Sequence, residues 1–179
     1  SASPLEGQIV ITSGIVTADF TSGYFLQDGS GTWNGIYVYG FGAGIDVGDE
    51  LTIQGEVDEY SGFTEIKNVS QTTVNSIGNT LPSAVILSTN NCNSEDYESV
   101  LVQTTGTCDS ENPDAPVDWG EWSVDDSSGT IRIDDNGFLF EPVLGTNYQV
   151  TGPIHYKNSA FKIEPRDAGD IIIPSAQPD

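Results

Sequence analysis

Apolar and polar positions alternate along this chain in short runs that are separated by Gly, Asn, Asp and Ser. A period of two is typical of strands that bury one face and expose the other. The runs form two sets of five, one in each half of the chain. The predicted strands are residues 8–19, 23–28, 35–40, 49–60 and 63–70, then 99–108, 118–126, 129–134, 147–157 and 160–165.

The two sets repeat one pattern at a spacing of roughly 98 residues, which indicates domain duplication. "YFLQDGSGTWNGIYVY" in the first half corresponds to "WSVDDSSGTIRI" in the second. Each copy has a glycine, Gly55 or Gly152, in the middle of its long fourth strand, and such a glycine lets a strand bend. Five strands with a bent fourth strand favour the OB-fold, whereas an immunoglobulin-like sandwich needs about seven. We therefore predict an all-β chain of two tandem five-stranded OB-like Greek-key barrels.

Composition shifts divide the chain into three parts. We expect the first barrel in residues 1–75, a linker in 76–98, and the second barrel with a C-terminal tail in 99–179. In the linker, "LPSAVILS" is apolar enough to pack as a strand or bridge, and "NSEDYES" is typical of a capped helical turn. We expect the tail to be one packed segment followed by a Pro-rich linker.

Charge narrows the possible functions. Five Lys and Arg face 27 Asp and Glu, so the net charge is -22 and the pI is about 4.1. Such a chain repels phosphate backbones unless metal ions intervene, and it also disfavours a membrane-surface role. The sequence has no Met and no stretch typical of a membrane span. We expect an exported protein, extracellular or at the cell surface, without membrane insertion.

Two cysteines, Cys92 and Cys108, lie in the second half with fifteen residues between them. In an acidic, exported chain such a pair predicts one disulfide. Closing a loop of this size would stabilise the fold by about 3 kcal/mol in the chain-entropy model. A Cys/His metal site would need more ligands than these and the single histidine, His155.

The aromatic residues of the first hairpin are either core or binding surface. Aligned with the second copy, Tyr24 falls opposite Trp122, and Tyr37 and Tyr39 fall opposite Ile131 and Ile133. Positions that are apolar in both copies predict an inward face, so these three tyrosines are assigned to the core. The candidates for an exposed, ligand-stacking surface are Phe25, Trp33, Phe41, Tyr60 and Phe63.

Acidic loops of the second half offer oxygen ligands of the kind that calcium prefers. The candidate metal ligands are Asp109, Glu111, Asp114, Asp125 and Asp126. None of these loops matches the EF-hand pattern. The alternative interpretation is a set of solvated acidic loops.

Two stretches of the first half, "GIVTADFTSGYFLQDGSGTWNGIYVYG" and "VGDELTIQGEVDEYSGFTEI", resemble the OB-fold-like modules of secreted bacterial nucleases. The second half resembles a companion module through "GEWSVDDSSG" and "YQVTGPIHYKNSAFKIEPRDAGDI". In those proteins the modules precede a catalytic domain of the endonuclease/exonuclease/phosphatase type, and similar modules occur in other exported multidomain proteins. The resemblance implies partners among adjacent domains of the same polypeptide and no catalytic residue in this chain.

The leading functional hypothesis is a non-catalytic accessory module of an exported bacterial multidomain protein, positioning a nuclease domain or binding a partner. Two alternatives stay open: a single-stranded nucleic-acid-binding module with metal-bridged phosphates, and a polysaccharide-binding module that uses Trp33 and nearby tyrosines. An enzyme is a weaker hypothesis, because His155 is the lone imidazole and no Ser-His-Asp or HExxH pattern occurs.

Overall fold

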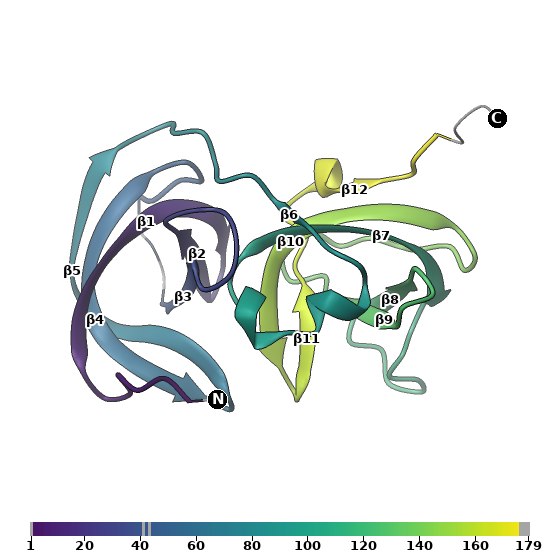
Figure 1. The fold of residues 1–179 in the computed structure, drawn as a ribbon, viewed down its shortest axis with the longest axis horizontal. Coiled ribbons are helices and arrows are strands. Elements are labelled where there is room, and N and C mark those ends of the chain that lie inside the picture. The colour runs from purple at the N-terminus through teal and green to yellow at the C-terminus, as the bar shows by residue number, and fades with distance from the viewer. Residues whose placement is uncertain (1, 41, 43, 176–179) are drawn as a thin grey trace.

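The computed structural model describes residues 2–40, 42 and 44–175, and it confirms an all-β chain with three short 3₁₀ helices. Two β units lie side by side along the longest axis, one formed by the first five strands and one by the remaining seven (Figure 1). Among the described residues, no helix has the length and apolar character needed to cross a membrane.

The first unit is a closed, OB-like barrel with the strand order β1-β2-β3-β5-β4. β3 and β5 pair in parallel and the other neighbours are antiparallel. Its observed boundaries match the predicted ones to within one residue, except that β5 continues past residue 70. The strands are β1 (Ile9–Phe20), β2 (Gly23–Gln27), β3 (Gly35–Tyr39), β4 (Glu50–Tyr60) and β5 (Phe63–Ser76).

Gly55 marks the bend of the long fourth strand, as predicted. The register between β4 and β5 shifts at this point, between Gln54 and Glu56. A Cβ at Gly55 would lie 2.4 Å from Cγ2 of Ile66, so no larger residue fits there. The bend closes the barrel over a core that includes Val16, Tyr24, Leu26, Val38, Leu51 and Ile53.

The second unit repeats the pairing scheme of the first. Its strands are β6 (Val85–Ile86), β7 (Leu101–Ser110), β8 (Trp122–Asp125), β9 (Thr130–Ile133), β10 (Asn147–Lys157), β11 (Ala160–Ile163) and β12 (Ile171–Ile172). They form a sheet of order β12-β10-β11-β9-β8-β7-β6 in which β10 also pairs with β7. Each pairing of the first barrel therefore has a counterpart here, including the parallel one, between β9 and β11.

The linker between the units is ordered. It contains β6, which pairs in parallel with β7, and the helices η1 (Asn90–Cys92) and η2 (Glu95–Tyr97). Ser94 caps η2 by accepting a hydrogen bond from the Asp96 N–H, as the acidic "NSEDYES" motif predicts. A third helix, η3 (Ala168–Asp170), precedes β12, and the Pro-rich end of the tail lies outside the described residues.

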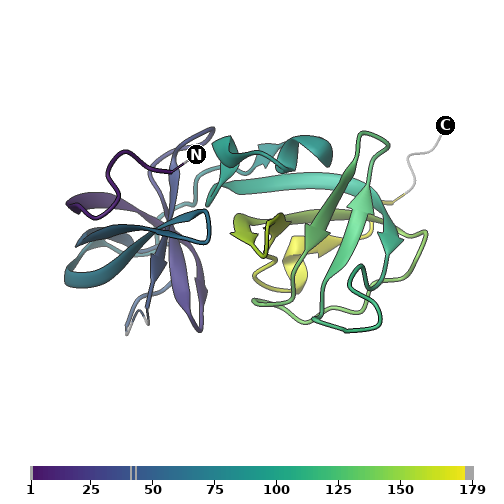
Figure 2. The same ribbon diagram turned by 90° about the horizontal axis from the view of Figure 1, so that it is seen from below.

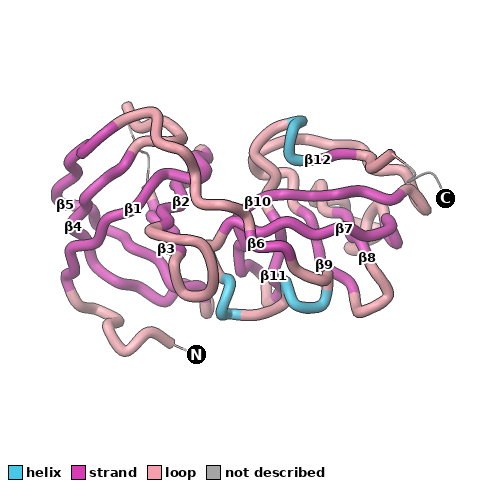
Figure 3. Tube along the Cα trace, turned by 45° about the horizontal axis from the view of Figure 1, so that its top comes forward, coloured by secondary structure: helices cyan, strands magenta, loops and turns pink. Residues whose placement is uncertain are grey.

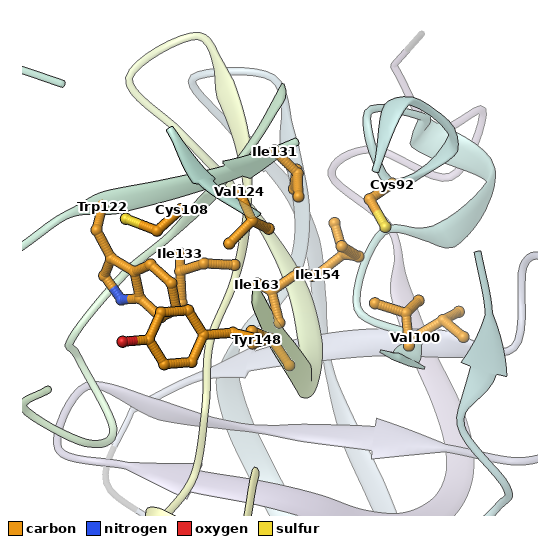
Figure 4. Packing of buried hydrophobic residues seen from close by; sticks show 12 residues of the cluster. Cys92, Val100, Cys108, Trp122, Val124, Ile131, Ile133, Tyr148, Ile154 and Ile163 are labelled. Carbon is orange, nitrogen blue, oxygen red and sulfur yellow. The ribbon is translucent and has the colours of Figure 1, made fainter. Parts of the chain in front are cut away.

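Both cysteines are free and buried, so the predicted Cys92–Cys108 disulfide is wrong in this structure. Cys92 belongs to η1 and Cys108 to β7, and Figure 4 shows Val124 and Ile131 lying between the two sulfurs. Both side chains belong to the core of the second unit, where they act as small apolar residues. Burial raises the pKa of the Cys92 thiol to about 12, which keeps it protonated at neutral pH.

The two units meet through specific polar contacts. Oε1 of Gln27, on β2, accepts a buried hydrogen bond of 2.9 Å from the Leu101 N–H on β7. The guanidinium of Arg166 donates to the Thr17 carbonyl at 3.2 Å, and the Thr64 N–H donates to Oε1 of Glu98 at 3.0 Å. These contacts hold the barrel against the second unit, which turns β10 and β11 toward it (Figure 2).

An apolar cluster fills the contact between the units. Ala18, Phe25, Tyr37 and Phe63 project outward from the barrel and are buried against Tyr156 of β10. Their burial explains why both faces of β2 are inaccessible, one covered by the barrel core and the other by the second unit.

Glu98, whose carboxyl accepts a hydrogen bond from the Thr64 N–H, should make the free energy of unfolding depend on pH. Burial raises its pKa to about 7 from the ordinary 4.5, the strongest of several influences on this carboxyl. Between those two pH values the folded protein keeps a proton that the unfolded chain loses, so the free energy of unfolding falls as the pH rises. We expect Glu98→Gln, which retains an acceptor for Thr64, to be more stable than the wild type above about pH 7 and not below about pH 4.5.

Urea unfolding at both pH values measures this difference. Glu6→Gln, at an exposed carboxylate, serves as the control and should show the same small difference at both. A Glu98→Gln effect of equal size at both pH values would contradict the prediction.

Candidate ligand-binding cleft

A cleft of about 470 Å³ lies between the barrel and the β10–β11 hairpin of the second unit. Its lining combines aromatic rings, hydroxyls, amides and charged groups of both signs. The residues are Ser22, Tyr37, Tyr39, Asp58, Tyr60, Ser61, Phe63, Glu65, Lys67, Asn136, His155, Tyr156, Lys157 and Asn158.

The barrel contributes its OB-type ligand face to this cleft. OB-folds bind oligonucleotides and oligosaccharides on strands two and three and on the loops between strands one and two and between strands four and five. Here Ser22 lies in the β1–β2 turn, Tyr37 and Tyr39 on β3, and Tyr60 and Ser61 in the β4–β5 turn. The opposite wall is the β10–β11 turn, so the second unit converts an open face into a cleft.

Two tyrosines are available for stacking. Tyr39 is 56% exposed at the end of β3, and Tyr60 is 68% exposed at the tip of the β4–β5 hairpin. The alignment of the two halves assigns Tyr39 to the core, which is wrong. An exposed phenol ring can stack on a base or a sugar and still hydrogen-bond through its hydroxyl.

Aromatic rings also pack around His155, which lines the cleft. The imidazole stacks on the Tyr37 ring at a centroid distance of 5.7 Å and an interplanar angle of 21°, and its centroid lies 4.7 Å from that of Phe63. Burial raises the pKa of the Tyr37 hydroxyl, which therefore stays neutral and lies 3.1 Å from the Ser22 hydroxyl. These contacts hold the imidazole in one place.

The buried carboxyl group of Glu164 orients the His155 ring. Nδ1 of His155 lies 2.7 Å from Oε1 of Glu164, which also accepts a hydrogen bond of 3.3 Å from the Asn136 amide. Burial raises the pKa of Glu164, and its Oε2 has no hydrogen-bond partner within the described residues. The pair fixes the ring orientation through Nδ1, so Nε2 is the nitrogen left for a ligand.

The charges of the cleft come from both units. Nζ of Lys67, on β5, lies 2.7 Å from Oδ1 of Asp58, and the hydrogen bond to this carboxylate raises the pKa of Lys67. Burial is the main cause that raises the pKa of Glu65, with Asp58 adding to it. Lys157 is exposed in the β10–β11 turn and has no ion pair within the described part of the chain.

The other cations are engaged elsewhere. Arg132 pairs with Asp114 and Glu121. Lys162 pairs with Glu121 and Asp134, and Arg166 with Asp170. The remaining two of the five Lys and Arg, Lys67 and Lys157, both line the cleft, and Lys67 is paired there with Asp58.

The structure places the predicted stacking residues in different environments. Tyr60 lines the cleft with its ring exposed, and Trp33 is 66% exposed but lies elsewhere on the barrel. Phe25 and Phe63 are buried, because the second unit covers the outer face of β2 and the start of β5, so their assignment to an exposed surface is wrong. Phe41 lies outside the described residues.

A register slip of one residue explains the errors on β3. The cross-strand partners are Tyr24 with Val38 and Leu26 with Ile36, whereas in the second unit Trp122 pairs with Ile133. Val38, not Tyr39, is therefore the counterpart of Ile133. Shifting a strand by one residue moves each side chain to the other face.

The predicted metal ligands are not brought together. Asp109 accepts hydrogen bonds from Ser123 and Thr130, and Asp114 pairs with Arg132. Glu111 accepts from the Leu144 N–H, Asp125 from the Ser127 and Gly129 N–H groups, and Asp126 from Thr89 and Ser128. Within the described residues no three His, Cys, Asp or Glu side chains are placed to hold a metal ion. These carboxylates stabilise turns and strand ends instead.

Sequence reasoning overlooked three residues of this site: Tyr39, His155 and Lys157. The signals available were the position of Tyr39 at the end of a strand and of Lys157 in a hairpin turn, both usual places for exposed side chains. His155 gave no such signal, because the aromatic rings that pack against it, those of Phe25, Tyr37 and Phe63, come from the first unit.

No protein-family model and no curated protein matches this chain. Among solved structures, it is similar to the Ifi202 HINa domain in complex with 20-bp double-stranded DNA, with a TM-score of 0.42 and 11% identity over 93% of this chain and 97% of that one. A second structure, reported under "Structural mimicry for functional antagonism", gives a TM-score of 0.44 and 12% identity over 96% and 94%. At such identities no site residue of those proteins can be assigned to a position here.

Proposed function

We propose that this chain is a non-catalytic binding module and that its cleft binds single-stranded nucleic acid. The observation that carries the proposal is the placement of Lys157, a cation with no ion pair among the described residues, beside two exposed tyrosines in a cleft that also holds Lys67. Single-strand sites combine stacking rings with positive charge along the backbone. In this arrangement Tyr39 and Tyr60 stack on bases, and Lys157 contacts a phosphate.

Single strands fit this cleft better than a duplex does. Unpaired bases can turn their faces to Tyr39 and Tyr60, and each stacked base contributes about 1–3 kcal/mol. A duplex would bring many phosphates close to a chain of net charge -22, which is unfavourable. The bound segment is therefore short, and stacking contributes more of the affinity than charge does.

The proposal also covers the architecture of the second half of the chain. The repeated pairing scheme and the second mid-strand glycine, Gly152, support a second OB-like barrel behind the linker. We infer a rigid pair of modules of an exported multidomain protein that presents a single strand to an adjacent domain, as the sequence resemblance to secreted nucleases implies.

Fluorescence anisotropy with a labelled dT oligonucleotide tests the proposal. With one phosphate contact, at Lys157, the logarithm of the association constant should fall with the logarithm of salt concentration with a slope of about -0.7. Lys157→Gln and Tyr60→Ala should each weaken binding about tenfold, from a lost phosphate contact and a lost stacked base respectively.

Thr73→Glu is the matched control, because it also makes the net charge more negative by one but lies at an exposed position outside the cleft. It should bind dT like the wild type. If the oligonucleotide does not bind at low salt, or if Lys157→Gln and Thr73→Glu weaken binding equally, the cleft is not a nucleic-acid site.

A further inference from the structure

Trp33 is the most unusual exposed side chain of the barrel. It lies in the β2–β3 connection, 66% exposed, with a φ of +64°. This left-handed backbone conformation is rare for a bulky residue and costs about 1–3 kcal/mol unless the surrounding structure enforces it. A bulky aromatic residue held in this conformation and still exposed to solvent is a candidate for ligand binding.

The loop that carries Trp33 is held in place by the linker. The Trp33 N–H donates to the Asp96 carbonyl on η2 at 2.9 Å, and the Ser30 hydroxyl donates to the Ser83 carbonyl at 3.0 Å. Figure 3 shows this loop beside the η2 helix. The indole is thus presented to solvent by a fixed backbone, at little further loss of conformational entropy when it binds a ligand.

Two adjoining hollows are both lined by Trp33. One, of about 370 Å³, is lined largely by apolar residues that include Leu5, Ile11 and Val57. The other, of about 350 Å³, shares Thr64 with the first and adds the carboxyl group of Glu98. The site therefore combines an exposed indole ring with apolar side chains and a carboxyl group.

The charge of these hollows selects the ligand class. Within the described residues, no Lys, Arg or His lines either one, whereas Asp28 lines the apolar hollow and Glu98 the polar one. Glu98 is only 9% exposed, and its Oε2 has no hydrogen-bond partner among the described residues. Neither hollow therefore offers an anion a positively charged partner, and the carboxyl groups of Asp28 and Glu98 can hydrogen-bond to hydroxyl groups.

We propose that Trp33 and its two hollows bind a pyranose ring of a neutral oligosaccharide. Such a ring has an apolar C–H face, which stacks on the indole, and a rim of hydroxyls, which donate to Asp28 and Glu98. OB-folds are suited to oligosaccharides as well as to oligonucleotides, and this site is separate from the cleft that holds Lys157. The chain thus carries a second binding site with a different ligand class.

Calorimetric titration with cello-, xylo-, manno-, malto- and chitin-derived hexaoses tests this assignment. At least one should bind with a Kd at or below about 1 mM. Trp33→Asn should weaken this binding about tenfold or more, since asparagine keeps the left-handed backbone and removes the stacking ring. Trp119→Asn, at an equally exposed tryptophan outside both hollows, and Lys157→Gln should leave it unchanged.

Three results would overturn the proposal. The first is that none of the five hexaoses binds at concentrations up to about 10 mM, well above the expected Kd. The second is that Trp33→Asn binds as tightly as Trp119→Asn. The third is that Trp33 instead mediates self-association, seen as a larger sedimentation coefficient that Trp33→Asn abolishes.

Discussion

Replacing Lys162 with alanine is expected to lower the free energy of unfolding by about 3–5 kcal/mol. The side chain lies on β11, is 1% exposed, and its Nζ contacts Oε1 of Glu121 and, at 3.3 Å, Oδ2 of Asp134. Both carboxylates are themselves buried. Without the lysine they would remain in the protein with less compensation, and this uncompensated charge costs far more than the ion pair contributes.

Chemical unfolding measures the loss, and Lys157→Ala is the matched control. This exposed lysine should change stability by no more than about 0.5 kcal/mol. Changing Lys162 to Met together with Glu121→Gln and Asp134→Asn should recover most of the stability, because no buried charge is then left without a partner. If Lys162→Ala is as mild as Lys157→Ala, the lysine is not buried between these carboxylates.

Gly35→Ala should destabilise the contact between the two units by about 1–3 kcal/mol. A Cβ at this position, the first residue of β3, would lie 2.3 Å from the carbonyl carbon and oxygen of Ser99. Backbone atoms cannot rotate away as a side chain can, so the linker and the barrel must separate. We expect a lower melting temperature and a larger radius of gyration in small-angle X-ray scattering.

Gly29→Ala provides the comparison within the same loop. Its added Cβ would meet first Oδ1 of Asn34, at 3.2 Å, which is a side-chain atom able to move. This variant should stay within about 0.5 kcal/mol of the wild type and keep its radius of gyration. Equal effects of the two substitutions would show that the close approach of Gly35 to Ser99 does not hold the units together.

The strands were largely predictable from the sequence because their signals are local. Alternation of apolar and polar residues located β4 and β10, and the turn residues between them and their partners indicated the hairpins. Gly55 and Gly152 identified the bends, since a glycine inside a long strand usually marks a bulge, a bend or a close approach of another backbone. These features depend on neighbours within a few residues.

The inward faces were less predictable where every residue is apolar. In "GIYVY" of β3, alternation cannot distinguish Ile36 and Val38 from Tyr37 and Tyr39. The structure buries Val38 in the barrel and Tyr37 against the second unit, and leaves Tyr39 exposed. A strand covered on both sides carries no period of two.

The amino-acid sequence alone specifies an acidic, all-β chain with two similar sets of strands. Which aromatic residues are accessible, that the cysteines stay apart, and that a cleft exists all follow from the packing of the two units. The cleft joins Tyr39 and Tyr60 to His155 and Lys157, about a hundred residues away along the chain. Its formation depends on how the second unit packs on the outer face of the barrel, and contacts over such sequence distances leave no trace in local alternation.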